Sequence, residues 1–177
     1  MCCICICRRN GSRPSDDELR RMRVYNPHGF GFVSETMNYK GVNFEAFLKR
    51  FHTVPEDENV IIHFRYATTG SVRKRNCHPF REGDIWFAHN GVLTIPTKGD
   101  ITDSEAAFRG YILPAVRLFG FGSPEMKHVI DTIIGNSKFA FMKDGEITTF
   151  GNFTRYGDRL YSNLRHMPYV SMPQMAV

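Results

Sequence analysis

The first seven residues, MCCICIC, contain four of the five cysteines of this 177-residue chain. This short alternation of cysteine and isoleucine has the period of a β-strand and not that of a helix. We therefore expect a strand at residues 2–7. Because successive side chains of a strand point to opposite faces, the cysteines at odd positions share one face and the two isoleucines share the other.

Three cysteines on one strand face allow more than one interpretation. Free cysteine is a small, readily buried side chain, so we favour core packing for Cys3, Cys5 and Cys7. A metal site remains an alternative, with Cys77 and His78 as further ligands, although this spacing is not diagnostic of zinc. Five cysteines in a chain for which we expect no export signal suggest free thiols in a reducing compartment. An odd number of cysteines also argues against a closed disulfide set.

Length and composition narrow the class of protein. The length suits one domain with its own core, and no apolar run approaches the 18–20 residues of a membrane span. Arg8 and Arg9 follow the first apolar stretch, which is therefore no signal peptide, and we expect a cytoplasmic protein. The formal charge is +5, with basic residues concentrated at 8–23 and 73–75. A nucleic-acid or nucleotide partner is possible, but a solvated basic face is the favoured explanation.

The remaining pattern predicts one mixed domain of helices and strands with largely antiparallel pairing. Ser15 and Thr102 each precede a glutamate by three residues, as in a capping box, and Pro114 should kink or end the helix that contains it. We expect strands at 30–35, 59–67, 84–91 and 160–163, a hairpin at 138–150, and helices at 15–26, 43–51, 102–116 and 124–134.

Cys2 differs from the other cysteines because of its position. Removal of Met1 would place its thiol and a free α-amine on the same residue. An α-amine has a pKa of about 7.7–8.0, so it can act as the base that generates a thiolate nucleophile.

Three further stretches hold more polar residues than a core requires. Arg65 ends an apolar strand, where it needs an anion or a structural salt bridge. Asn90 and Gly91 form either an ordinary turn or the two donors of an oxyanion hole. Asp103 either complements a helix dipole or contributes to a site.

Five motifs follow one another along the chain: Met1-Cys2, H-x-R-x-A-T-x-G from His63 to Gly70, N-x-H-P-F from Asn76 to Phe80, A-H-N-G from Ala88 to Gly91, and D-S-E from Asp103 to Glu105. In this order they resemble one known family, the class II glutamine amidotransferases, which are N-terminal-nucleophile (Ntn) hydrolases. The NPHGFGF and LYSN segments resemble early and late motifs of that family, so the resemblance covers about residues 1–165.

The resemblance implies an α+β fold, the four-layer αββα sandwich of two mainly antiparallel sheets between helices. It places a type 2 glutamine amidotransferase domain at residues 1–166 and leaves 167–177 as a peripheral tail. It implies no cofactor and no metal.

The resemblance also implies a catalytic set that acts on L-glutamine. Cys2 would attack the side-chain amide, and its α-amine would be the base and later the acid. The Asn90 side chain and the Gly91 N–H would bind the oxyanion. Arg65 would bind the substrate α-carboxylate and Asp103 its α-ammonium group. A thioester on Cys2 would then be hydrolysed to glutamate.

Other motif positions would shape the pocket or contact the substrate: Tyr66, Thr68, His78 and His89. His63, in an apolar strand, is better explained as a core histidine.

The chain departs from the family pattern at four positions. Tyr66 replaces a frequent tryptophan, Thr69 a histidine, His28 an aspartate and Cys3 a glycine. We expect these changes to affect the glutamine loop and the start of the first strand.

We expect no appended synthase or synthetase domain in this chain, so we expect a separate partner enzyme to receive the released ammonia. The alternative is an Ntn amidohydrolase that acts on another small amide without transfer. A third possibility is a binding module for metal or nucleic acid.

Overall fold

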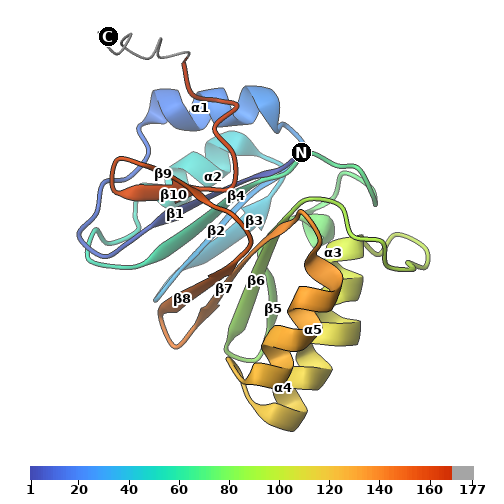
Figure 1. Cartoon of the computed structure of the whole chain (residues 1–177). Coiled ribbons are helices and arrows are strands. Elements are labelled where there is room, and N and C mark those ends of the chain that lie inside the picture. The colour runs from blue at the N-terminus through green and yellow to red at the C-terminus, as the bar shows by residue number, and fades with distance from the viewer. Residues whose placement is uncertain (169–177) are drawn as a thin grey trace, which may run out of the picture.

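The computed structural model describes residues 1–168 and contains two β-sheets with helices on their outer sides (Figure 1). The strands are β1 Cys3–Cys7, β2 Phe30–Ser34, β3 Asn38–Gly41, β4 Val60–Phe64, β5 Phe80–Glu82, β6 Ile85–Asn90, β7 Lys138–Lys143, β8 Glu146–Phe150, β9 Thr154–Tyr156 and β10 Arg159–Tyr161. The helical segments are α1 Asp16–Tyr25, α2 Phe44–Phe51, η1 Lys74–Asn76, α3 Asp103–Ala107, η2 Phe108–Ile112, α4 Leu113–Phe119 and α5 Pro124–Ile134.

The two sheets are antiparallel. The first has six strands in the order β3-β2-β4-β1-β10-β9, and the second has four in the order β5-β6-β7-β8. Helices α1 and α2 lie on the outer side of the first sheet, and the α3–α5 region lies on the outer side of the second (Figure 1). This arrangement confirms the predicted four-layer sandwich.

Three hydrophobic clusters fill the three spaces between the four layers, and β1 contributes to two of them. Cys3, Cys5 and Cys7 pack with residues of α1 and α2. Ile4 and Ile6 face the other way, into the cluster between the two sheets. The alternation of MCCICIC is therefore the pattern of a central strand buried on both faces, and the packing interpretation of the three cysteines is confirmed.

Most predicted elements are confirmed. The Ser15 and Thr102 side chains each accept a hydrogen bond from the backbone N–H of the glutamate three residues later, as the capping-box spacing predicts. The helix predicted at 102–116 differs, because it changes to π-helical geometry at Phe108–Ile112 before Pro114 begins α4. Proline lacks the N–H that an α-helix needs, and this local widening accommodates it without ending the helix. The short strands β3, β5 and β9 were not predicted.

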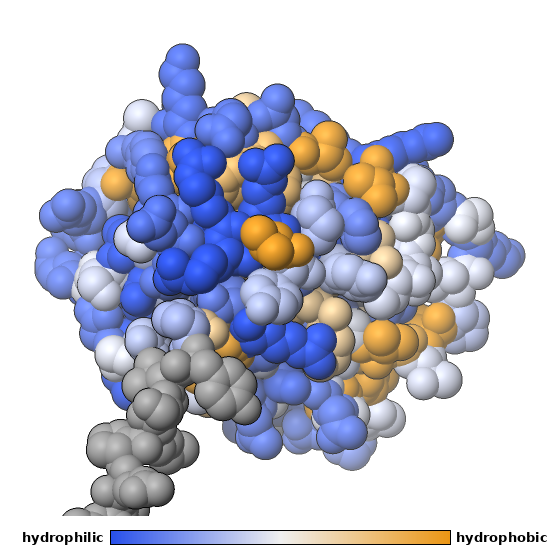
Figure 2. Space-filling model, turned by 90° about the horizontal axis from the view of Figure 1, so that it is seen from above, coloured by the Kyte–Doolittle hydropathy of each residue, from blue (hydrophilic) through white to orange (hydrophobic). Residues whose placement is uncertain are grey.

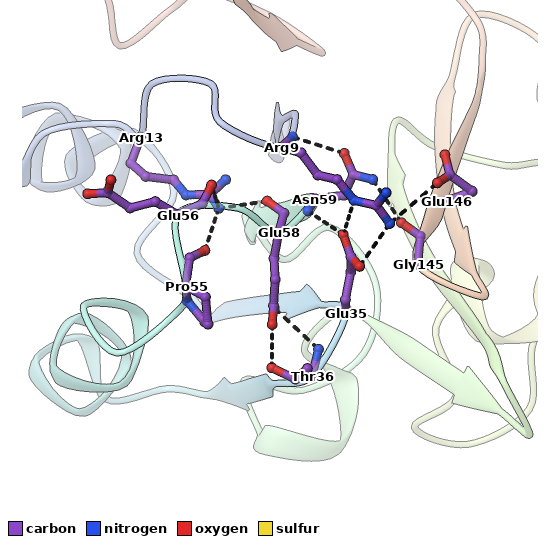
Figure 3. Close-up of polar contacts among 10 residues, drawn as sticks. All are labelled: Arg9, Arg13, Glu35, Thr36, Pro55, Glu56, Glu58, Asn59, Gly145 and Glu146. Atoms are coloured by element: carbon purple, nitrogen blue, oxygen red, sulfur yellow. Dashed lines mark hydrogen bonds and ion pairs between the residues drawn. The ribbon is translucent and has the colours of Figure 1, made fainter.

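Hydrogen bonds and ion pairs connect the loops that follow β1 and β2, the loop before β4 and the β7–β8 turn, at the end of β1 opposite Cys2 (Figure 3). Arg9 donates to both carboxylate oxygens of Glu35, at 2.6 and 2.9 Å, and Glu35 also accepts from the Asn59 N–H. The Asn59 amide donates to the Gly145 carbonyl in the β7–β8 turn at 2.9 Å. These contacts join the two sheets at this end.

The described helices are all too short or too polar to cross a membrane. Over the face seen from above, hydrophilic side chains predominate and apolar ones occur in small groups (Figure 2). Met167 packs against the cluster beneath α1 and α2, whereas residues 169–177 of the predicted tail lie outside the described residues. The domain boundary at residue 166 therefore stays a prediction.

Candidate active site

Strand pairing brings Cys2 and Arg65 together. β1 and β4 are antiparallel, and Cys3 lies opposite Phe64. Cys2 directly precedes Cys3, and Arg65 directly follows Phe64, so the two residues meet at the same end of neighbouring strands. Residues 63 positions apart in sequence are in this way placed at one site by the register of two buried strands.

The Cys2 thiol is buried against the backbone of Tyr66, the residue that follows Arg65 in the sequence. Its sulfur accepts from the Tyr66 N–H at 3.3 Å and donates to the Tyr66 carbonyl at 3.5 Å. Burial raises the pKa of the Cys2 thiol, while the Tyr66 contact, the chain's N-terminal ammonium and the Arg65 charge act in the opposite direction. A thiolate here therefore depends on nearby positive charge and donors.

The buried Arg65 guanidinium binds the loop that follows it. It donates to the carbonyls of Thr69, Gly70 and Ser71 at 2.7, 3.2 and 2.8 Å. The sequence suggested an anion or a salt bridge; in residues 1–168 its hydrogen-bond partners are carbonyl oxygens instead. A guanidinium has five N–H groups, so donors remain for a carboxylate.

The loop at 66–71, here called the cover loop, is also held at its ends. The Ala67 N–H donates to Nδ1 of His28 at 3.0 Å, and Ser71 donates twice to the Asp100 carboxylate at 2.6 Å. Tyr66 is 42% exposed and its ring lies 5.1 Å from that of His28. The replacement at position 28 therefore bears directly on how the cover loop is fixed.

The end of β6 supplies Asn90 and Gly91. The Asn90 amide donates to the Ser162 hydroxyl at 2.9 Å, and Ser162 also accepts from the Ile4 N–H at 2.8 Å. One amide hydrogen of Asn90 remains for another acceptor. A side chain at Gly91 would clash with the structure as it stands, because its Cβ would lie 2.1 Å from Oγ of Ser137.

Three neutral histidines lie close to this site. His63 donates from Nε2 to the His89 carbonyl at 3.0 Å, and the His63 and His78 rings lie 4.1 Å apart. Burial lowers the pKa of His63 and of His89 to about 3 and that of His78 well below its ordinary value. The core position predicted for His63 is confirmed, although its Nδ1 has no hydrogen-bond partner among residues 1–168.

The sequence-predicted residues line one small cavity of about 20 Å³. This is room for about one water, far below the 300–1,000 Å³ of typical ligand pockets. Of the nine predicted site residues, only Asn90 is not in its wall. The wall residues among them are Cys2, Arg65, Tyr66, Thr68, His78, His89, Gly91 and Asp103.

Asp103 and three unpredicted residues complete the surroundings. Asp103 accepts from the Leu93 N–H at 2.9 Å, and Ser104 contacts Nδ1 of His89 at 2.7 Å. Ser162 and Asn163 hold the first strand, the latter by donating to the Cys2 carbonyl at 2.7 Å. Ser162 and Asn163 belong to the LYSN motif, but the motif alone did not indicate which residues they would contact.

Within the described range, no group of three or more His, Cys, Asp or Glu side chains is placed to hold a metal.

The fold and the N-terminal cysteine at its cavity define the class as an Ntn-hydrolase sandwich. Two solved structures share the fold: a glutamine phosphoribosylpyrophosphate amidotransferase from B. subtilis, complexed with ADP and GMP, and an allosteric regulatory enzyme of purine biosynthesis. Their TM-scores are 0.61 and 0.57, both at 16% identity, and they cover 94% and 91% of this chain. Residues 43–173 match the family model of class II glutamine amidotransferases. The chain belongs to this family of enzymes.

Sequence comparison agrees with the family. Over 62 residues the chain is 52% identical to a Haemophilus influenzae protein that carries the provisional name of glutamine amidotransferase; the match covers 28% of this chain. The chain spans only 21% of that relative and 42% and 41% of the two solved structures.

Proposed function

We propose that this chain hydrolyses the side-chain amide of L-glutamine and that Cys2, freed by removal of Met1, is the nucleophile. The observation that carries the proposal is the convergence of Cys2, Arg65 and Asp103 on one cavity. A thiol, a cation and a carboxylate at one site match the three groups of a free glutamine that must be attacked or held.

The chemistry proceeds in two steps. The Cys2 sulfur bonds to the amide carbon, the C–N bond breaks, and the Cys2 α-amine passes the thiol proton to departing ammonia. Water then cleaves the thioester to give glutamate. Asn90 through its amide and Gly91 through its N–H stabilise the oxyanion in both steps.

The other predicted residues bind and orient the substrate. Arg65 donates to the α-carboxylate and Asp103 accepts from the α-ammonium group. Tyr66 and Thr68 come from the cover loop, and the buried neutral rings of His78 and His89 shape the cavity floor. Because the cavity holds about one water, glutamine entry requires the cover loop to move, as lids do in many enzymes.

Glutamate production from glutamine and from other γ-glutamyl amides tests the substrate. Glutamine should give the highest kcat/KM, and Cys2→Ala should abolish the activity. A clear preference for another small amide would favour the alternative, an amidohydrolase without ammonia transfer. Transfer to a separate acceptor enzyme is the second part of the proposal, and a partner that raises glutaminase activity would support it.

A further inference from the structure

A second cavity, of about 610 Å³, lies beside the site and has cationic walls. We call it the basic cavity. Its walls come from β3, η1, β5, β6 and the helical run that begins with α3. Five wall residues are cationic and one is anionic: Lys40, Lys74, Arg75, Arg81 and Arg109 against Glu105. Walls of one charge sign concentrate ligands of the opposite sign.

Much of this positive charge is not neutralised by the protein. Arg109 pairs with Glu82 and Glu105 at 2.9 and 3.0 Å. By contrast, Lys40, Lys74 and Arg81 have no carboxylate oxygen within 4 Å in the part of the chain that the structure describes. Three cations around one hollow without protein counter-charges favour an anionic ligand.

Lys40 is the most informative of these cations. Its ammonium donates to the Arg75 carbonyl at 3.3 Å and lies 5.0 Å from the centre of the Phe80 ring. Burial lowers the pKa of Lys40, the charges of Arg109 and Lys74 act in the same direction, and the charges of Cys77 and Glu105 act against it. An anion in the basic cavity would stabilise the charged form of this buried ammonium.

We propose that the basic cavity binds a phosphorylated small molecule. Phosphate oxygens accept charge-assisted hydrogen bonds from both lysine and arginine, and the volume lies in the range of small-molecule sites. Nucleic acid fits less well, because single strands need open aromatic faces to stack on. The Trp86 ring is instead covered by the Arg81 guanidinium, 4.8 Å from its centre.

The basic cavity shares backbone with the candidate active site. Pro79 and Glu105 line the basic cavity, and their neighbours His78 and Ser104 line the Cys2 cavity. The two sites are nevertheless separate, so ligand binding here does not depend on glutamine hydrolysis. A Cys2→Ala chain should bind the ligand as well as the unchanged chain does.

Titration calorimetry at low salt, with ADP and with pyrophosphate as probes, tests the proposal. We expect saturable one-to-one binding that Lys40→Gln/Arg81→Gln weakens at least tenfold. The control Lys127→Gln/Arg155→Gln removes two exposed cations elsewhere and should leave affinity unchanged. If the double variant does not fold, the exposed Lys74→Gln replaces it.

Three results would overturn the proposal. The first is that neither probe binds saturably. The second is that the control variant weakens binding as much as the cavity variant does. The third is that a single-stranded RNA oligonucleotide binds while both small probes fail, which would make the basic cavity part of a nucleic-acid surface. Both probes are also titrated into the Cys2→Ala chain, which lacks the proposed nucleophile. Because probe binding by this chain does not depend on glutamine hydrolysis, a failure of the basic-cavity proposal is distinguishable from a failure of the proposed glutaminase activity.

Discussion

The sulfur of Cys2 lies 3.3 Å from the backbone nitrogen of Tyr66, the first residue of the cover loop. The proposed nucleophile is thus in direct contact with the segment that closes its cavity. Arg65 donates to three carbonyls of the same loop, so the residue proposed to bind the substrate also fixes the cover loop. Substrate binding and loop opening should therefore be coupled.

Arg65→Lys should lower kcat/KM for glutamine by about 10- to 100-fold. Lysine lacks the planar guanidinium that donates to the loop carbonyls and that is proposed to bind the substrate carboxylate. Loss of one hydrogen bond to a charged group costs about 1.5–3 kcal/mol, which corresponds to this decrease in kcat/KM. Steady-state glutaminase kinetics measure the effect, with the exposed Arg73→Lys as a matched control. Equal activity of the two variants would remove Arg65 from the site.

His28→Ala should raise KM for glutamine by up to about tenfold, with a smaller change in kcat. It removes the acceptor for the Ala67 N–H, a hydrogen bond of about 0.5–1.5 kcal/mol that fixes the cover loop. His28→Asp restores an acceptor at this position and should recover most of the affinity. If His28→Asp is as impaired as His28→Ala, the contact with Ala67 does not set the loop.

Gly91→Ala should destabilise the protein by about 1–3 kcal/mol, because the new Cβ would overlap Ser137. Urea denaturation measures the loss. Gly120→Ala is the matched control, since Gly120 also has a positive φ, of 92°, but has open space around its Cβ position. A loss at Gly91 no larger than at Gly120 would mean that backbone strain, and not the clash, dominates.

His63 should make stability fall as the pH falls from 7 to 5. Its pKa is about 3 in the folded protein, against about 6.5 when unfolded, so the unfolded chain binds the extra proton in this range. The expected contribution is about 2 kcal/mol, and stability is recovered as the pH rises above 6.5. Urea midpoints of His63→Gln at pH 7 and 5 should show a correspondingly smaller difference. An unchanged difference would exclude His63 as a source of the pH dependence.

The layers of the fold could be predicted largely from local patterns. The cysteine–isoleucine alternation of β1 gave its two buried faces, and Ser15 and Thr102 marked two helix starts. The short strand β3 has exposed and half-buried residues, so no apolar run or clean alternation reveals it. Its position depends on pairing with β2, which is a tertiary contact.

The site residues could be named from ordered motifs, but their contacts could not. Arg65 was expected to bind an anion, whereas its guanidinium donates to carbonyls of the loop that follows it. The bond from Asn90 to Ser162 joins residues 72 positions apart, and no local pattern reports such a pair. The hydrogen bond from the Ala67 N–H to His28 likewise depends on how β2 and β4 are paired.

The central claim is that Cys2 is the nucleophile, and covalent labelling tests it most directly. The purified protein would be treated with 6-diazo-5-oxo-norleucine, a glutamine analogue that alkylates such thiols, and examined by intact and peptide mass spectrometry. We predict a chain without Met1 that carries one label, on Cys2, and no label in the Cys2→Ala variant. A chain that retains Met1 and stays unlabelled, or a label on another cysteine, would contradict the account.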